Sequence, residues 1–185
     1  LWHTTAIRES FAAAMAEEGV PFLGMYDVYA AEGLPEAYYY ATDHHYTIRG
    51  ALRAAQAAVE RINADTGLGL GALNAEDYDW ETLPNPFLGS SNRKLYGLWA
   101  NDDAVELPYL KESIPFTRKD RGEDTAAELF ALPETAGEDV TYSVYMGGDI
   151  AETIIDTGRE ELPTLLLYGD SFSNPLECLL WRDFN

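Results

Sequence analysis

The sequence predicts an α/β fold, and three stretches of the chain carry this prediction. The Ala-rich stretch 6–18 favours a helix that ends at Gly19, and the apolar run 20–29 that follows favours a buried strand. A second apolar run, residues 162–168, has the composition of a central parallel strand that is buried on both faces. Helices that alternate with such strands are typical of layered α/β domains. We therefore expect a parallel sheet packed against helices.

A further helix is expected at about residues 48–63. Thr47 has a side chain suited to cap its N-terminus, while Gly67 and Gly69 lie beyond its C-terminal end. Apolar residues recur at helical spacing along it, at Leu52, Ala55, Val59 and Ile62. The capping residue, the glycines and the apolar stripe all predict the same element.

Residues 66–162 differ in character from the rest of the chain. They hold most of the prolines and many glycines, with short aromatic or β-branched runs at 96–99, 140–146 and 153–155. Frequent prolines and glycines between short runs of this kind favour short strands joined by loops. We interpret this stretch as a β-rich, loop-heavy insertion within a single domain that comprises residues 1–185.

The apolar run 162–168 leads into Gly-Asp-Ser-Phe and then into another predicted helix. Asn174 is suited to the N-cap of that helix and Pro175 to its first position, while Glu177 completes a capping-box pattern. Ser171, in the middle of the connecting turn, therefore lies between a predicted strand and a predicted helix.

The chain is strongly acidic. Twelve Lys and Arg residues against 32 Asp and Glu residues give a net charge of −20. Binding to phosphates depends on clustered Lys and Arg, so we expect no nucleic-acid partner. No apolar run approaches the length of a membrane helix, and no stable membrane insertion is expected. The single Cys178 sits among leucines, which predicts a buried structural thiol.

Ser171 is the candidate nucleophile. Its predicted position puts the hydroxyl at the carboxyl end of the sheet, where the sites of α/β proteins form. Its backbone N–H is close to the start of a helix and can face a developing oxyanion. A serine hydroxyl needs a base within hydrogen-bond reach to act as a nucleophile. Alone, the Gly-Asp-Ser motif is equally compatible with a simple turn.

Asp43 and His45 supply the missing partners. Alternate side chains of an extended segment share a face, so Asp43 and His45 can point the same way while His44 points opposite. Asp43 could then accept from one ring nitrogen of His45, leaving the other free for a serine proton. Two alternatives stay open: a metal site formed by these three residues, and a structural hydrogen-bonded cluster. The remaining histidine, His3, is expected to be a surface residue.

Several blocks of the sequence resemble the DHHW family. The first is Thr42-Asp43-His44-His45-Tyr46-Thr47 followed by Gly50-Ala51, with Tyr46 where that family usually has Trp. Later blocks are residues 87–90 (FLGS), 142–148 (YSVYMGG) and 165–174 (LLLYGDSFSN). The DHHW family is similar to the alginate O-acetyltransferase group, and both resemble SGNH hydrolases in which the Asp-His block precedes the serine block.

The resemblance implies a three-layer SGNH-like domain and specific roles for its residues. Asp43 orients, His45 is the base and Ser171 is the nucleophile. SGNH enzymes complete the oxyanion hole with a Gly and an Asn from two further blocks, which the permuted order places after the serine. The printed sequence continues for only 14 residues beyond Ser171, so we expect it to lack these blocks. Asn174 is a candidate oxyanion donor, and its N-cap position explains it equally well.

The predicted function is serine-dependent transfer of an acyl group, acetyl above all, or ester hydrolysis on a carbohydrate or cell-envelope polysaccharide. A small acyl donor and a carbohydrate acceptor are the implied partners, with no cofactor and no metal. The alternative is a non-catalytic carbohydrate-binding or envelope scaffold protein that retains the fold. The family resemblance implies an extracellular or cell-envelope location. The sequence opens on Leu1 and shows no signal peptide, which leaves export open.

Overall fold

The computed structural model describes the backbone of residues 2–185 and the side chains of residues 4–185, so the expected surface position of His3 lies outside the described side chains. Its helices are α1 (Trp2–Glu17), α2 (Met25–Ala31), α3 (Ile48–Thr66), α4 (Ser90–Lys94) and α5 (Ser173–Leu180). Its strands are β1 (Tyr78–Thr82), β2 (Glu106–Leu110), β3 (Thr117–Asp120), β4 (Glu123–Thr125) and β5 (Thr153–Asp156). None of the helices in this described part is long and apolar enough to span a bilayer.

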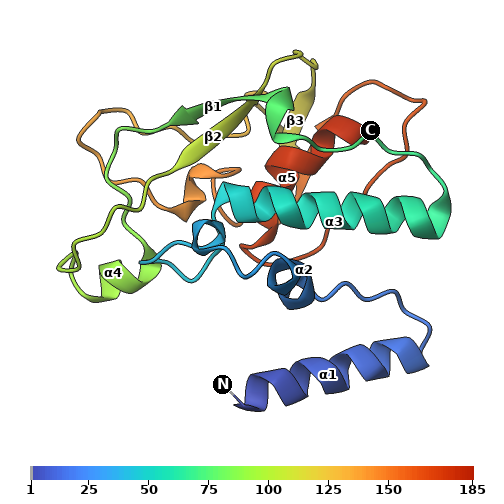
Figure 1. Ribbon diagram of the computed structural model, residues 1–185. Coiled ribbons are helices and arrows are strands. Elements are labelled where there is room, and N and C mark those ends of the chain that lie inside the picture. The colour runs from blue at the N-terminus through green and yellow to red at the C-terminus, as the bar shows by residue number, and fades with distance from the viewer. Residues whose placement is uncertain (1) are drawn as a thin grey trace.

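The N-terminal region departs from the sequence prediction after its first helix. α1 forms, ends before Gly19 and lies at the edge of the fold in Figure 1, where Arg8 pairs with Asp27 of α2 at 3.6 Å. The run 20–29 is not a strand, because it is irregular up to Gly24 and then forms α2. The helical conformation is supported by Tyr29. Its buried side chain packs against α3, where its hydroxyl donates to the Gly50 carbonyl at 2.8 Å.

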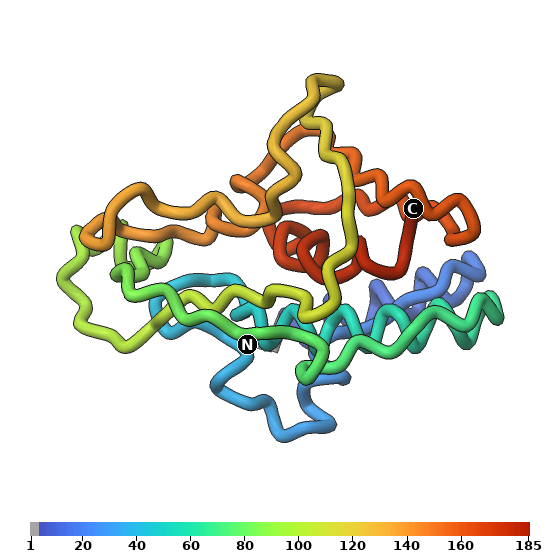
Figure 2. The backbone as a smooth tube through the Cα atoms, turned by 90° about the horizontal axis from the view of Figure 1, so that it is seen from above, coloured from blue at the N-terminus to red at the C-terminus, as the bar shows by residue number. Residues whose placement is uncertain are grey.

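Helix α3 forms the centre of the molecule and packs against α5 (Figures 1 and 2). Thr47 caps it as predicted, with its side-chain oxygen accepting from the Gly50 N–H at 3.2 Å. The left-handed Gly67, with φ +70°, ends it. Apolar side chains from α3, β2, α5 and the loops between them form one core, including Ile48, Ala51, Ala55, Leu107, Tyr145 and Leu179.

The strands form two small antiparallel sheets, not the expected parallel one. β1 pairs with β2, and β3 lies between β4 and β5. All five strands fall within the stretch predicted to be β-rich, and the run 153–155 belongs to β5. The runs 96–99 and 140–146 are not strands. The first follows α4 as a loop, and the second contains a 3-10 turn at Tyr142–Val144.

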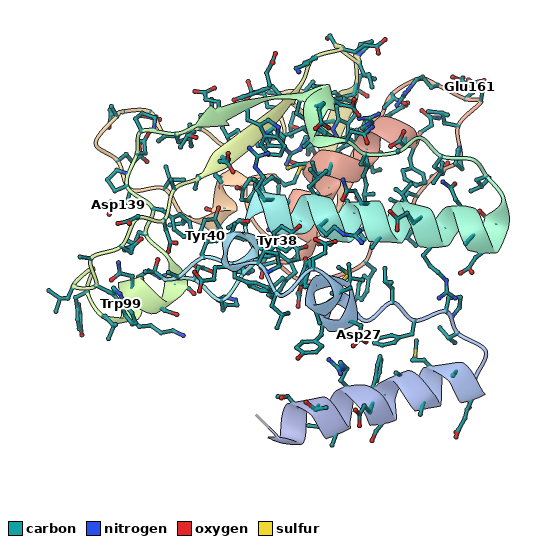
Figure 3. All side chains as sticks on the ribbon, in the orientation of Figure 1. Asp27, Tyr38, Tyr40, Trp99, Asp139 and Glu161 are labelled. Carbon is teal, nitrogen blue, oxygen red and sulfur yellow. The ribbon has the colours of Figure 1, made fainter. Side chains whose placement is uncertain are left out.

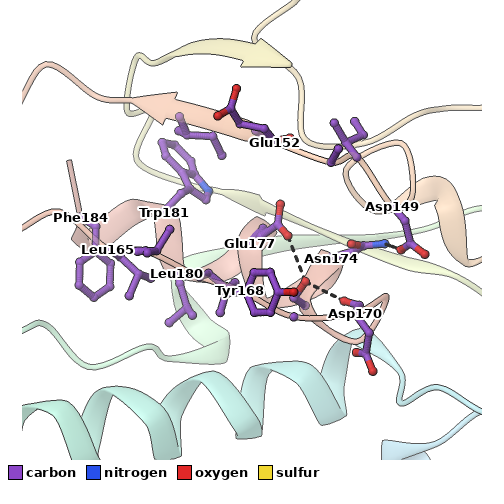
Figure 4. A pocket seen from close by; sticks show the side chains of 18 of the residues that line it. Asp149, Glu152, Leu165, Tyr168, Asp170, Asn174, Glu177, Leu180, Trp181 and Phe184 are labelled. Atoms are coloured by element: carbon purple, nitrogen blue, oxygen red, sulfur yellow. Dashed lines mark hydrogen bonds between the residues drawn. The ribbon is translucent and has the colours of Figure 1, made fainter. Parts of the chain in front are cut away.

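The run 162–168 is also not a strand in the described chain. A strand requires a neighbour, and none of the five strands lies beside this segment, so the backbone of 164–168 makes no hydrogen bond. Leu166 and Tyr168 are almost fully exposed, at 90% and 97%. The segment borders a hollow of about 630 Å³ between α5 and β5 (Figure 4). The sequence predicted a strand buried on both faces here, and the described chain shows neither a strand nor burial of Leu166 and Tyr168.

Candidate active site

The imidazole of His45 lies between a serine and an aspartate. Its Nε2 is 2.7 Å from the Ser171 hydroxyl oxygen, and its Nδ1 is 2.6 Å from Asp43 Oδ1. Both distances are within hydrogen-bond range. The structure therefore brings together the three side chains that the sequence singled out, although 126 positions separate His45 from Ser171.

The loop that carries Asp43 and His45 is held from outside. A bridge between Tyr39 and Tyr46 closes it at its base. Asp103 then accepts from the backbone N–H of Ala41 at 2.9 Å, and from the N–H and hydroxyl of Thr42 at 2.8 and 2.6 Å. Nothing in the sequence indicates that Asp103 holds this loop, because no local pattern connects it to Thr42, which lies 61 positions away.

Each oxygen of the Asp43 carboxylate has a defined partner. Oδ1 accepts from the backbone N–H of His45 at 3.0 Å as well as from its ring, and Oδ2 accepts from the Ser90 N–H at 2.5 Å. Burial by itself raises the pKa of Asp43, but these hydrogen bonds outweigh it and lower the pKa below its ordinary value. Asp43 is therefore charged at neutral pH and can hold the His45 ring in one tautomer.

His44 does not point away from the site as expected. Its ring centroid lies 3.8 Å from that of His45, and its Nδ1 is 2.8 Å from the Ser90 hydroxyl oxygen. The alternation rule fails because residues 41–45 form a bend in which the Asp43 side chain bonds the His45 N–H, not an extended strand. Asp43 and His45 meet through this local turn. The His44 side chain is 59% exposed at the rim.

Tyr142 completes the surroundings of the imidazole. Its ring stacks on His45 with centroids 3.8 Å apart and only 5° between the planes. Phe172 approaches at 4.8 Å in a tilted arrangement. His45 is thus packed between aromatic rings and is 5% exposed. Tyr142 lies in one of the blocks that resemble the DHHW family, but that resemblance alone gave it no role.

Ser171 and Asn174 face a pocket of about 260 Å³, which also borders Asp149. Asn174 is not the N-cap of α5, since the helix begins at Ser173 and Phe172 precedes it without a side-chain cap bond. The Asn174 side chain instead turns inward, is 5% exposed and donates its Nδ2 to Asp149 Oδ1 at 3.1 Å (Figure 4). Its position beside Ser171 suits an oxyanion donor, although its amide already has a partner.

Asp43, His44 and His45 also meet a geometric condition for metal binding, since one donor atom from each lies within 4.8 Å of the others. Two of these residues are already engaged. Asp43 accepts three N–H groups, and both ring nitrogens of His45 lie within hydrogen-bond distance of Asp43 and Ser171. The arrangement therefore fits a hydrogen-bonded relay better than a metal centre, in which His45 needs a free lone pair.

No family model matches the sequence, and no curated protein matches it. Solved structures do match. A DHHW family protein from Eubacterium siraeum has 24% identity and a TM-score of 0.67, with 89% of this chain aligned to 54% of that one. PatB1 from Bacillus cereus with a sulfonyl adduct has 19% identity and a TM-score of 0.69, over 89% of this chain and 55% of PatB1. A second PatB1 structure has 20% identity and a TM-score of 0.67, over 90% and 60%.

The resemblance inferred from the sequence is confirmed at the level of the fold. This chain spans 54 to 60% of the length of the three matched structures. It is a mixed α/β fold with small sheets whose structural neighbours include a DHHW family protein and PatB1.

Proposed function

We propose that this chain carries the catalytic serine site of an enzyme that transfers an acyl group, acetyl above all, to a carbohydrate or cell-envelope polysaccharide, or that hydrolyses such esters. One observation carries the proposal: His45 lies within hydrogen-bond reach of both Ser171 and a charged Asp43. Base, orienting carboxylate and nucleophile are the three parts that acyl-serine chemistry requires.

The first half-reaction forms an acyl-serine. The Ser171 proton moves to His45 Nε2 as Oγ bonds to the carbonyl carbon of the acyl donor, whose oxygen becomes an oxyanion. Asp43 stabilises the imidazolium through Nδ1. Collapse of the intermediate re-forms the carbonyl and breaks the bond to the leaving group, which takes the proton from His45. Asn174 is the candidate side chain for the oxyanion, beside the backbone N–H of Ser171.

The second half-reaction mirrors the first. A hydroxyl of the acceptor gives its proton to His45 and attacks the acyl-serine, and Ser171 recovers a proton as it leaves. Water in place of the sugar hydroxyl makes the same site an esterase. The PatB1 structure with a sulfonyl adduct supports this reading, since sulfonyl electrophiles react with activated nucleophiles.

The finer architecture belongs to the same proposal. A three-layer SGNH-like domain, with 162–168 as a strand of its parallel sheet, would provide hydrogen-bond partners for residues 164–168, whose backbone makes no hydrogen bond within the described part of the chain. An extracellular or cell-envelope location follows from the proposed polysaccharide acceptor.

Hydrolysis of a chromogenic acetyl ester tests the proposal. Ser171→Ala should lower turnover by orders of magnitude, because alanine keeps the turn but removes the nucleophile. Ser91→Ala, at an exposed serine of α4 nearby, is the matched control and should keep turnover. If wild type and Ser171→Ala hydrolyse the ester at the same background rate, and neither acetylates an oligosaccharide, the fold serves instead as a non-catalytic carbohydrate-binding scaffold.

A further inference from the structure

This chain departs from the family that its sequence resembles at Tyr46, which stands where that family usually has Trp. The Tyr46 side chain is 6% exposed, and its hydroxyl donates to the backbone carbonyl of Phe172, the residue that follows Ser171. Tyr and Trp each carry one hydrogen-bond donor on an aromatic ring, and Phe has none. The substitution therefore keeps a donor at a position that lies next to His45 in the sequence.

The Tyr46 hydroxyl joins the two halves of the candidate site. Residues 41–46 carry the base and its orienting carboxylate, and residues 170–173 form the turn that carries the nucleophile. Within the described part of the chain, two hydrogen bonds connect these segments: one between His45 and Ser171, and one from Tyr46 to Phe172. The two bonds are formed by adjacent residues on both sides, so the second restrains the geometry of the first.

The backbone that carries Tyr46 is itself held in place. Tyr46 forms a bridge with Tyr39, and the N–H of Thr47 donates to the Tyr38 carbonyl at 2.9 Å. The first turn of α3 packs directly against it, since a Cβ added at Gly50 would lie 3.0 Å from the Tyr46 Cβ. The hydroxyl therefore projects towards the nucleophile turn from a restrained position.

The other hydrogen bonds of the nucleophile turn are local. The Asp170 carboxylate accepts from the Phe172 N–H at 3.0 Å, and the Asp170 carbonyl accepts from the Ser173 N–H at 2.8 Å. These bonds set the shape of the turn but not its distance from His45. The Phe172 ring packs against Tyr46 edge to face, with centroids 5.1 Å apart, and lies tilted 4.8 Å from His45. Ring contacts of this kind permit sliding, whereas the hydroxyl contact is directional.

The direction of the Tyr46 hydrogen bond does not change with pH. Burial raises the pKa of Tyr46 well above its ordinary value, so the hydroxyl keeps its proton. A backbone carbonyl such as that of Phe172 can only accept. The hydroxyl is therefore always the donor.

We propose that Tyr46 is a positioning residue of the serine site: its hydroxyl holds Phe172, and through it Ser171, at hydrogen-bond distance from the Nε2 of His45. Without this donor the turn is free to shift relative to the imidazole. A displacement of about 1 Å at a catalytic group can lower a rate by about 10²-fold. The inference rests on the proposed function for its effect on turnover, but the position of Ser171 can be measured without any turnover.

Tyr46→Phe tests this inference, with Tyr40→Phe as the matched control. Tyr40 lies near the N-terminal end of α3 in Figure 3, and it is buried with its hydroxyl 3.2 Å from that of Tyr145. Each variant keeps its aromatic ring and loses one buried hydrogen bond, so both should unfold at a temperature about 2–4 °C lower than wild type.

Nuclear magnetic resonance of the His45 imidazole reports the position of Ser171. At alkaline pH, the ¹⁵N resonance of Nε2, assigned with the help of His45→Ala, depends on whether the Ser171 hydroxyl donates to that nitrogen. In Tyr46→Phe this resonance should move most of the way to its position in Ser171→Ala. In Tyr40→Phe it should stay where it is in wild type.

Hydrolysis of an acetyl ester should follow the same pattern. Tyr46→Phe should lower kcat by about tenfold or more and leave KM unchanged, because the nucleophile and not the substrate is displaced. Tyr40→Phe should change neither constant. An unchanged Nε2 resonance in Tyr46→Phe, or an equal change in Tyr40→Phe, would overturn the inference. So would a rise in KM at constant kcat, which would place Tyr46 at the substrate. A displaced resonance in Tyr46→Phe, in a protein whose wild type hydrolyses no ester, would support the positioning role and refute only the enzymatic proposal.

Discussion

The ring of Tyr142 lies parallel to the imidazole of His45, with 5° between their planes. The contact restrains the orientation of the His45 ring. In the proposed reaction, the π face of Tyr142 would also stabilise the imidazolium that forms during proton transfer. The Tyr142 hydroxyl is buried and has no hydrogen-bond partner among the described residues, and burial raises its pKa far above the usual value.

We therefore expect the aromatic ring of Tyr142, and not its hydroxyl, to contribute to turnover. Tyr142→Phe should keep esterase turnover and leave the free energy of unfolding equal or up to about 1 kcal/mol higher, since it removes an unsatisfied polar group. Tyr142→Leu should lower kcat by about tenfold or more, because the imidazolium that forms during proton transfer then loses the stabilising aromatic face. Urea unfolding and steady-state kinetics on both variants check this, and equal kcat values in the two would contradict it.

The adjacent histidines should differ sharply in importance. His45→Ala removes the base and should lower turnover by about 10²–10⁴-fold. His44→Ala removes an exposed side chain whose described hydrogen bond is to the Ser90 hydroxyl, so most turnover should remain. Equal losses in the two variants, together with stoichiometric zinc by elemental analysis, would favour the metal interpretation instead.

Gly89 tests the coupling between α4 and the catalytic loop. A Cβ at this position would lie 2.3 Å from the Thr42 carbonyl oxygen, so Gly89→Ala must push the two backbones apart. We expect a loss of about 1–3 kcal/mol in unfolding free energy, and about a tenfold fall in turnover as the Ser90 N–H moves away from Asp43. Gly137→Ala, where nothing lies within 4 Å of the added carbon, should do neither.

Glu177 gives the protein a predictable dependence of stability on pH. Burial raises its pKa above the ordinary value, and the hydrogen bond from Ser173 offsets only part of this. The folded state therefore favours the neutral carboxylic acid of Glu177. Its contribution to the free energy of unfolding is fully present below the unfolded pKa of about 4.3, and it is lost as pH rises through the higher folded pKa. Glu177→Gln should therefore be more stable than wild type at neutral pH, by a margin that shrinks under acidic conditions.

Thermal unfolding at acidic and neutral pH checks this margin. Glu177 and Glu152 both line the hollow between α5 and β5. Glu152→Gln removes an exposed charge there and so serves as the control for the general relief of charge repulsion in an acidic chain. A Glu177→Gln effect no larger than that of Glu152→Gln at neutral pH would contradict the account.

The candidate site could be predicted because its signals are local. Asp43 and His45 lie two positions apart, and a serine after an apolar run suggested a nucleophile at a turn. What the sequence could not reveal is long-range: Asp103 holds the catalytic loop from 61 positions away, and Tyr142 reaches His45 from a different part of the chain. No pattern within a short window encodes such contacts.

The strands were harder to predict for a related reason. The runs 20–29 and 162–168 are apolar and short, and such runs become strands only where a neighbour supplies hydrogen bonds. The first is helical at its end, where Tyr29 packs onto α3, and the second has no strand beside it among the described residues. Helix α3 was predicted closely, since its cap and its apolar stripe lie within the helix and at its ends.

Labelling of Ser171 by a sulfonyl fluoride tests the central claim most directly. Peptide mass spectrometry after treatment with phenylmethylsulfonyl fluoride should place one adduct on Ser171, since only a serine with a base within reach reacts readily. His45→Ala should abolish the adduct, and Asp43→Asn should slow its formation. An adduct spread over several serines, or one on Ser171 that forms equally fast in His45→Ala, would show that His45 does not activate Ser171 and would contradict the account.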